Sequence, residues 1–242
     1  MPLTNQLILV TGAAGGLGGC ASRFLANQGA TILLLDKNLP KLERIYDCIV
    51  TENGAEPIIC PFDLAGANEQ QYLELAESIM DRFGSLQGVL HSAVEFSAYT
   101  PISQHSTHDW GHTLNVNLNS VFLLCRVLLP VLQNSSHASI VFTSDSTARV
   151  GPAYAGAYGV SKIALEGFAR ILAEELEAGQ KIRVNTLVPG PVDTPTRKKA
   201  FPGESKSQLA HPDSLKSLYS YLFSEASLGV TGKIIDAQTF KI

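Results

Sequence analysis

Leu7-Ile8-Leu9-Val10-Thr11-Gly12-Ala13-Ala14-Gly15-Gly16-Leu17-Gly18 joins a short apolar run directly to a glycine-rich turn. The apolar run predicts a buried strand, and the residues after the turn have a helical pattern. Glycines allow a tight turn and a close approach of the backbone to a pyrophosphate, which the unpaired amides of a helix N-terminus attract. A glycine turn without a ligand is the alternative interpretation. We favour a dinucleotide site that includes Gly12, Ala14, Gly15, Gly16, Leu17 and Gly18.

Short apolar runs and longer helical patterns alternate along the rest of the chain. The runs are continuous rather than alternating in polarity, which is typical of strands buried on both faces. The longest helical patterns are at 69–83, 114–132 and 158–176. This alternation predicts an α/β, Rossmann-type doubly wound three-layer fold around a parallel sheet of roughly seven strands. The predicted strands are 7–10, 31–35, 58–62, 89–90, 139–143, 182–188 and 234–235.

The chain length predicts one dinucleotide-binding domain over residues 1–242, because 242 residues suit one large α/β domain. One irregular stretch, 189–212, is rich in proline, lysine, serine and glycine. A loop of that length in a compact domain is usually functional or mobile. We therefore expect residues 193–214 to close over a substrate as a lid.

Composition argues against several classes of protein. The net charge of −4 gives no basic surface, so we expect no nucleic-acid partner. No uninterrupted apolar run approaches about 20 residues, and no secretory pattern follows Met1, so we expect a cytoplasmic protein with no membrane partner. The four cysteines form no Cys-x-x-Cys pair, which suits reduced thiols. The histidines at 105, 108 and 112 lack further ligands nearby, and we expect no metal site.

Tyr158-Gly159-Val160-Ser161-Lys162 places a tyrosine and a lysine on one face of a predicted helix. A free tyrosine has a pKa of about 10, and a neighbouring ammonium group favours the phenolate and lowers that pKa. Such a pair can transfer a proton to or from a carbonyl or alcohol oxygen while a nicotinamide carries the hydride. The sequence therefore predicts an oxidoreductase that interconverts an alcohol and a ketone or aldehyde.

Asp36 ends the second predicted strand, about 20 residues after the glycine turn. A carboxylate at this position can accept hydrogen bonds from the adenosine ribose hydroxyls. It would also repel the 2′-phosphate of NADP by about 1 kcal/mol or more. The sequence therefore favours NAD. Lys37 follows directly and could pair with that phosphate, so NADP remains the alternative cofactor.

The motifs Thr-Gly-x-x-x-Gly-x-Gly, here 11–18, and Tyr-x-x-x-Lys, here 158–162, resemble those of the short-chain dehydrogenase/reductase family. The resemblance extends from Leu7 to about Ala237. Within the family, segments 141–144 and 235–238 are similar to a group of uncharacterised bacterial oxidoreductases. The resemblance implies a small-molecule alcohol or carbonyl substrate, and association into homodimers or homotetramers.

The resemblance also implies roles for single residues. Asn117 matches the helix asparagine that supports a water feeding protons to the lysine, with Asn115 and Asn119 as competitors. The Asp63-Leu64 pair matches residues beside the adenine, although Asp63 could instead cap a helix. The remaining cofactor contacts are implied along the strand ends, at Ala93, Pro189, Gly190, Val192 and Thr194.

Two residues depart from the family pattern. Asp145 lies 13 residues before Tyr158, where the family has a substrate-binding serine. An ionised aspartate cannot donate that hydrogen bond, and it would raise the pKa of Tyr158. Either Ser144 or Ser146 replaces the serine, or a protonated Asp145 donates, or the chain is a nucleotide-binding sensor or subunit with impaired turnover. Val94, which replaces a glycine beside the cofactor, also motivates the last interpretation.

Overall fold

Seven parallel strands form one sheet in the order β3-β2-β1-β4-β5-β6-β7 in the computed structural model, which describes residues 3–179 and 181–241. The predicted doubly wound α/β fold is therefore confirmed. The chain direction across the sheet reverses between β1 and β4, and ligands bind at such a switch point in this class of fold. The strands are β1 (Leu7–Thr11), β2 (Thr31–Asp36), β3 (Ile58–Pro61), β4 (Gly88–His91), β5 (Ala138–Thr143), β6 (Ile182–Val188) and β7 (Ile234–Asp236).

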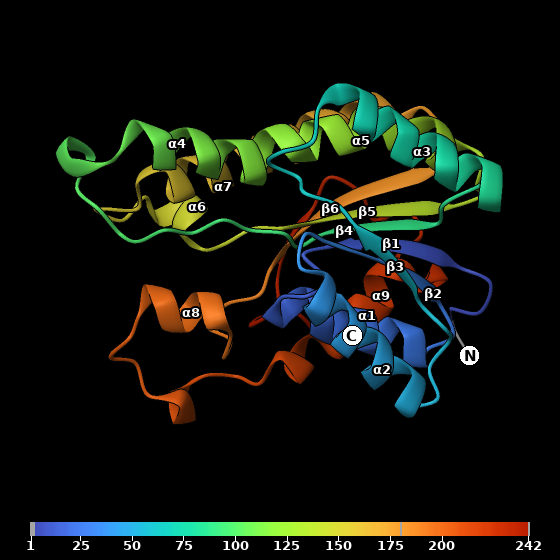
Figure 1. Ribbon diagram of the computed structural model, residues 1–242, viewed down its shortest axis with the longest axis horizontal. Coiled ribbons are helices and arrows are strands. Elements are labelled where there is room, and N and C mark those ends of the chain that lie inside the picture. The colour runs from blue at the N-terminus through green and yellow to red at the C-terminus, as the bar shows by residue number, and fades with distance from the viewer. Residues whose placement is uncertain (1–2, 180, 242) are drawn as a thin grey trace.

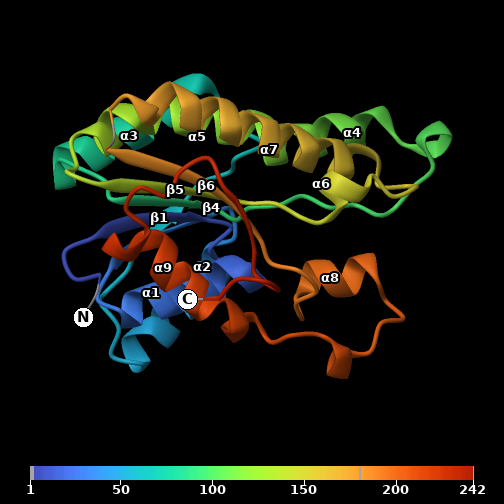
Figure 2. The ribbon, with the colours of Figure 1, turned by 180° about the vertical axis from the view of Figure 1, so that it is seen from behind.

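Helices cover both faces of this sheet (Figures 1 and 2). Leu7 and Leu9 of β1 belong to one apolar core, whereas Ile8 and Val10 belong to the other. This division explains why the strands are continuously apolar, because successive side chains enter opposite cores. The helices α3 (Glu69–Phe83), α5 (Ser120–Gln133) and α7 (Gly156–Glu177) cover one face, and α1 (Gly16–Asn27), α2 (Leu39–Thr51) and α9 (Lys216–Phe223) cover the other.

The helix predicted over 114–132 is part of a longer helical stretch. It begins as α4 (Thr107–Leu114), passes through a π turn, η2 (Asn115–Asn119), and continues as α5. This stretch, Thr107–Gln133, is long and apolar enough to cross a membrane by length and composition, and half of its most apolar window is buried within the protein. No uninterrupted apolar run marks this stretch, because small and polar residues are interspersed along the helix. Its buried side packs on the sheet as a core helix.

The predicted irregular stretch after β6 contains short helices: α8 (Pro195–Ala200), η3 (Lys206–Gln208) and η4 (Pro212–Leu215). A backbone bridge between Val192 and Ala210 joins the two ends of this excursion. Figures 1 and 2 show α8 projecting beyond the same end of the sheet as α4 and α6 (Thr147–Val150). The other short helices are η1 (Ile102–Gln104) and η5 (Glu225–Ser227).

Candidate active site

The turn between β1 and α1 has a shape that only glycine allows. Gly12 has a φ of 66°, and a Cβ atom there would lie 2.7 Å from the Cα atom of Ala93. A Cβ atom at Gly18 would collide with the carbonyl oxygen of Gly12. The N-cap residue of α1 is Gly15, which makes no side-chain cap, so first-turn amides remain available to an anion. This turn fits a pyrophosphate group.

A cleft lies at the carboxyl ends of the strands, beside the glycine turn. It is lined from both sides of the switch point, by residues of the turn after β1 and of the segments after β4 and β6. All but one of the predicted cofactor residues lie on its wall. These are Gly12, Gly15, Gly16, Leu17, Gly18, Asp36, Asp63, Leu64, Ala93, Tyr158, Lys162, Pro189, Gly190, Val192 and Thr194.

The predicted residue that is not on this wall is Ala14. Its amide donates a 3.3 Å hydrogen bond to Oδ2 of Asp36, while the amide of Asn38 donates a 3.0 Å bond to Oδ1. These contacts fix the Asp36 carboxylate at the end of β2, on the cleft wall. The neighbouring Lys37 also lines the cleft and is exposed.

Tyr158 contacts Asp145 directly. The Tyr158 hydroxyl donates a 2.9 Å hydrogen bond to Oδ2 of Asp145. The other carboxylate oxygen accepts a 2.8 Å bond from the amide of Thr147 and a 3.4 Å bond from the hydroxyl of Ser146. The carboxylate is thus held so that one oxygen faces the phenol. Both Asp145 and Tyr158 line the cleft.

The pKa of Tyr158 is raised well above its ordinary value, first by burial and then by the negative charge and hydrogen bond of Asp145. The raising of this pKa by Asp145 agrees with the sequence analysis, and together with burial it outweighs the lowering expected from Lys162. The ammonium group of Lys162 lies 5.7 Å from the centre of the tyrosine ring and donates a 2.8 Å bond to the carbonyl oxygen of Thr143. Burial lowers the pKa of Lys162 to about 8, against the opposing charges of Asp145 and Glu166.

The two serines beside Asp145 have different surroundings. Ser144 is buried, and its hydroxyl donates a 2.8 Å bond to Oε1 of Glu166 on α7. The same carboxylate oxygen lies 3.7 Å from a guanidinium nitrogen of Arg149. Ser146 is exposed, at the N-terminus of α6. Of the two, Ser144 contributes to the cleft wall.

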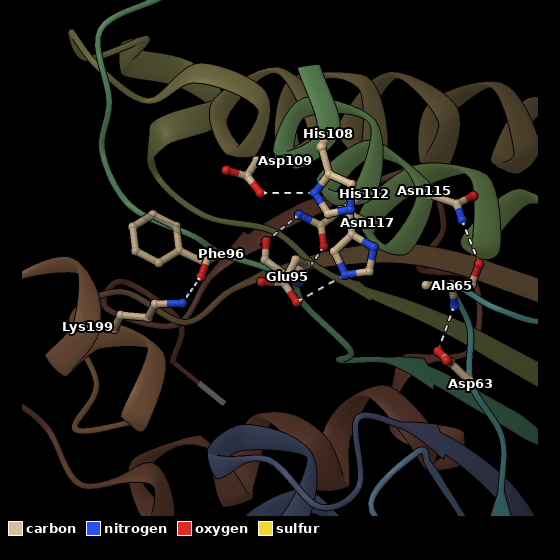
Figure 3. A network of polar contacts seen from close by, with 10 residues as sticks. All are labelled: Asp63, Ala65, Glu95, Phe96, His108, Asp109, His112, Asn115, Asn117 and Lys199. Atoms are coloured by element: carbon tan, nitrogen blue, oxygen red, sulfur yellow. Dashed lines mark hydrogen bonds and ion pairs between the residues drawn. The ribbon is translucent and has the colours of Figure 1, made fainter. Parts of the chain in front are cut away.

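Asn117, in the π turn, is buried and fixes the segment after β4 (Figure 3). Its amide group donates 3.0 Å bonds to the carbonyl oxygen of Glu95 and to the hydroxyl of Ser161, and its oxygen accepts a 2.7 Å bond from the amide of Glu95. The competing Asn115 points elsewhere and donates a 2.9 Å bond to the carbonyl oxygen of Ala65. Asn119 is exposed.

Aromatic side chains form a wall of the cleft that sequence analysis did not single out. The ring of Phe96 packs edge-on against Tyr158 and Tyr99, with centroid distances of 5.1 and 5.2 Å. Tyr99 contacts Phe201 at 5.5 Å, and the guanidinium group of Arg197 lies 3.9 Å from the centre of the Phe201 ring. These rings come from segments about 100 residues apart, so no local pattern in the sequence brings them together.

The histidines have local contacts. His91 is buried, stacks on Phe142 at 4.9 Å, and has a pKa lowered to about 3 by burial, which suits a packing role. His108 and His112 stack on one another at 6.1 Å, and His112 lies 3.7 Å from Oε2 of Glu95 (Figure 3). Within residues 3–179 and 181–241 no group of three or more His, Cys, Asp or Glu side chains is arranged to hold a metal ion.

Comparisons with known proteins identify one family. Residues 6–205 match the sequence model of the family described as short chain dehydrogenase. The uncharacterised oxidoreductase YciK of Escherichia coli K12 is 38% identical over 236 residues, which cover 98% of this chain and 93% of YciK. A short chain dehydrogenase from Shigella flexneri 2a, complexed with NADP, has a TM-score of 0.95 at 38% identity and 98% coverage of both chains. One from Pseudomonas syringae has a TM-score of 0.95 at 40% identity, covering 98% of this chain and 96% of the other.

The extent of these similarities goes beyond a shared architecture. Sheet topology alone would say little about activity, because many unrelated enzymes share this fold. The family match, however, spans both the glycine turn and the helix that carries Tyr158 and Lys162. The chain therefore belongs to the short chain dehydrogenase family of oxidoreductases.

Proposed function

We propose that the protein is a nicotinamide-dependent oxidoreductase that interconverts a small alcohol and the corresponding ketone or aldehyde. The observation that carries this proposal is the position of Tyr158 and Lys162 on the wall of the cleft that also contains the glycine turn. Proton-transfer groups and a pyrophosphate site in one cleft suit a reaction in which a hydride and a proton move together. The NADP complex of the Shigella flexneri relative supports a nicotinamide cofactor.

The wall residues suggest how the dinucleotide would lie. The glycine turn would hold the pyrophosphate, with Asp36 beside the adenosine ribose and Asp63-Leu64 near the adenine. Ala93, Pro189, Gly190, Val192 and Thr194 would hold the nicotinamide end. When bound, the nicotinamide supplies hydride transfer to or from the substrate carbon. We propose NAD as the preferred form, because the fixed Asp36 carboxylate would repel a 2′-phosphate.

The chain's own side chains would manage the proton. Tyr158 would exchange it with the substrate oxygen, and the Lys162 ammonium would support the tyrosine from the same helix. Asn117 would act by fixing the Glu95 backbone and Ser161 beside this pair. The Ser144 hydroxyl already donates its proton to Glu166, so it is poorly placed to donate a hydrogen bond to a substrate. The Ser146 hydroxyl donates to Asp145.

We propose that residues 193–214 act as the substrate lid. Thr194, Thr196, Arg197 and Phe201 line the cleft from this segment. The substrate would sit between these residues and Tyr158, beside the rings of Phe96 and Tyr99. This placement supports a lid that covers the reacting atoms rather than a loop that serves only as a connection.

Two further proposals concern the protein in the cell. Phe122 on α5, and Val160, Ile163 and Ile171 on α7, are exposed apolar side chains. We propose that they join copies of the chain into a homodimer or a homotetramer. We also propose a cytoplasmic location. All four cysteines are free thiols, as is usual in a reducing compartment.

The experiment that tests the proposed function is a fluorescence titration with NADH and with NADPH, followed by an assay with a panel of secondary alcohols and ketones. We expect tighter binding of NADH and turnover that is lost in Tyr158→Phe. Binding without turnover in the wild type, with turnover gained in Asp145→Ser, would instead establish an impaired nucleotide-binding protein. Failure to bind either dinucleotide would overturn the proposal.

A further inference from the structure

The Tyr158–Asp145 contact orients the phenol proton toward the carboxylate. The 2.9 Å bond runs from the tyrosine hydroxyl to Oδ2, and Oδ1 is occupied by the amide of Thr147 at 2.8 Å. Asp145 is half-buried on the cleft wall, so its carboxylate can also reach water. The carboxylate is therefore placed to receive a proton from Tyr158 and to release it to solvent.

We infer that Asp145 is a catalytic proton acceptor that works through Tyr158, an inference that rests on the proposed oxidoreductase function. In alcohol oxidation the substrate hydroxyl proton passes to the Tyr158 oxygen as the O–H bond breaks. In the same step the phenol proton passes to Oδ2 of Asp145, so a new carboxylic O–H bond forms. The substrate carbon loses its C–H bond and two electrons as a hydride to an oxidised nicotinamide dinucleotide. The products are a carbonyl and a neutral Asp145, which then loses its proton to water.

This relay avoids a step that the site opposes. A lone Tyr158 base would have to exist as a phenolate, which burial and the charge of Asp145 both disfavour. With Asp145 as the final acceptor, the tyrosine is neutral before and after the transfer. The carboxylate becomes neutral in the step and regains its charge when its proton leaves to solvent. The ammonium group of Lys162 is bonded to the carbonyl oxygen of Thr143 and lies 5.7 Å from the centre of the tyrosine ring.

The charged groups that face this pair come from three elements. Lys162 lies beside it on α7, Tyr99 approaches from the segment after β4, and Arg197 approaches from α8. Arg197 is already paired with Glu204, through bonds of 2.6 and 2.7 Å. Asp145 is the carboxylate that accepts the Tyr158 hydrogen bond and raises the pKa of Tyr158, whereas the charge of Arg197 lowers that pKa.

The relay makes the two directions of reaction depend on one ionisation in opposite senses. Oxidation needs the Asp145 carboxylate, so its rate rises with pH until Asp145 has lost its proton. Carbonyl reduction needs a protonated Asp145 to resupply Tyr158, so its rate falls as pH rises through the same value. The pH at which oxidation reaches half its maximal rate should therefore equal the pH at which reduction falls to half of its own.

The test compares the wild type with two variants. Asp145→Asn keeps the shape of the side chain but cannot accept a proton, and Asp145→Ser removes the carboxylate while Tyr158 and Lys162 remain. Asp109→Asn on exposed α4 is the matched control. With NAD⁺ and cyclohexanol or another alcohol of the panel, we expect Asp145→Asn to lower kcat/KM for oxidation by about 10²–10⁴-fold. Asp145→Ser should move the acid limb of oxidation to higher pH. Unchanged rates and pH limbs in both variants would overturn the inference.

A second readout requires no turnover. The phenolate absorbance of Tyr158 is measured against pH as the difference between each protein and its Tyr158→Phe counterpart. We expect Tyr158 to ionise at lower pH in Asp145→Asn than in the wild type, and identical titrations would overturn the inference. Dinucleotide titration of the same proteins separates the two claims. Loss of binding in every protein contradicts the proposed function, whereas normal binding with unchanged titration and pH limbs contradicts only the relay.

Discussion

The ammonium group of Lys199 donates a 2.6 Å hydrogen bond to the backbone oxygen of Phe96, which joins α8 to the segment after β4 (Figure 3). Phe96 lines the cleft from the segment after β4, and Lys199 lies on the helix of the proposed lid. Together with the contact between Tyr99 and Phe201, this bond would hold the proposed lid against the cleft, and it could break without disturbing either core.

We predict that Lys199→Met loosens residues 193–214. The bond to Phe96 is lost while most of the apolar stem is kept, so the lid should open more often. We expect faster amide hydrogen exchange in that segment and a several-fold higher KM, with little change in dinucleotide affinity. Lys198→Met, an exposed neighbour on the same helix, is the control. Equal exchange rates in the two variants would argue against the bond as a latch.

Substitution of Asp36 should change cofactor preference. In Asp36→Ser the repulsion of a 2′-phosphate disappears, and Lys37 remains beside the cleft to attract it. We expect the ratio of NADPH to NADH affinity to rise at least fivefold, measured by fluorescence titration at fixed ionic strength. The double variant Asp36→Ser, Lys37→Ala should lose much of that gain. A ratio that stays at the wild-type value would show that Asp36 does not select the cofactor.

Lys162 should give the stability of the protein a measurable dependence on pH. Burial lowers its pKa from 10.5 to about 8, so between these values the unfolded chain binds more protons than the folded one. Lys162 therefore makes the free energy of unfolding increase as pH rises from about 8 to 10.5. Below pH 8 the full cost of burying the charge is present, on the order of 3 kcal/mol.

The variant Lys162→Met isolates this effect. Buried cysteines act in the opposite direction above pH 9, since burial raises the pKa of Cys20 and of Cys60 from 9.0 to about 11. The difference between wild type and Lys162→Met cancels that contribution. We expect urea unfolding to show the variant more stable at pH 7, by about 1–3 kcal/mol after the lost bond to Thr143 is counted. That advantage should shrink by pH 10, and a constant difference would contradict the shift.

The serines beside Asp145 should respond differently to alanine substitution. Ser144→Ala removes a buried hydroxyl that bonds the buried Glu166 carboxylate, and should lower the free energy of unfolding by about 1–3 kcal/mol. Ser146→Ala, at an exposed position, should change it by less than about 0.5 kcal/mol. Urea titrations compare the two. If Ser144→Ala instead left stability unchanged and abolished turnover, Ser144 would be the substrate donor.

The sequence predicted the elements whose signals are local. The helix at 69–83 has the same bounds in the structure, because Asn68 and Gln71 form a capping box and Gly84 ends the helix in a left-handed conformation. Strand β6 was likewise predicted at its observed bounds, although Arg183, Asn185 and Thr186 interrupt its apolar residues. The helical residues before Leu114 were missed, because the histidines and Gly111 of α4 hide its periodicity.

The site was predictable only in part. Tyr158 and Lys162 could be placed together because four residues of helix bring them to one face. That Asp145 bonds Tyr158, and that Ser144 turns to Glu166, depends on the direction in which the chain leaves β5, which residue spacing does not specify. The aromatic wall and the Lys199 bond join segments about 100 residues apart, so only the folded chain reveals them.

The π turn at Asn115–Asn119 joins α4 to α5. A π turn accommodates one residue more than an α-helix. Deleting one residue there would convert the turn into ordinary α-helix and leave α4 and α5 in their present phases. The change would fall on the side chains of the turn itself, so Asn117 would no longer be held against the Glu95 backbone and Ser161. Within this fold, a deletion at the turn would loosen the segment beside the cleft without altering the sheet.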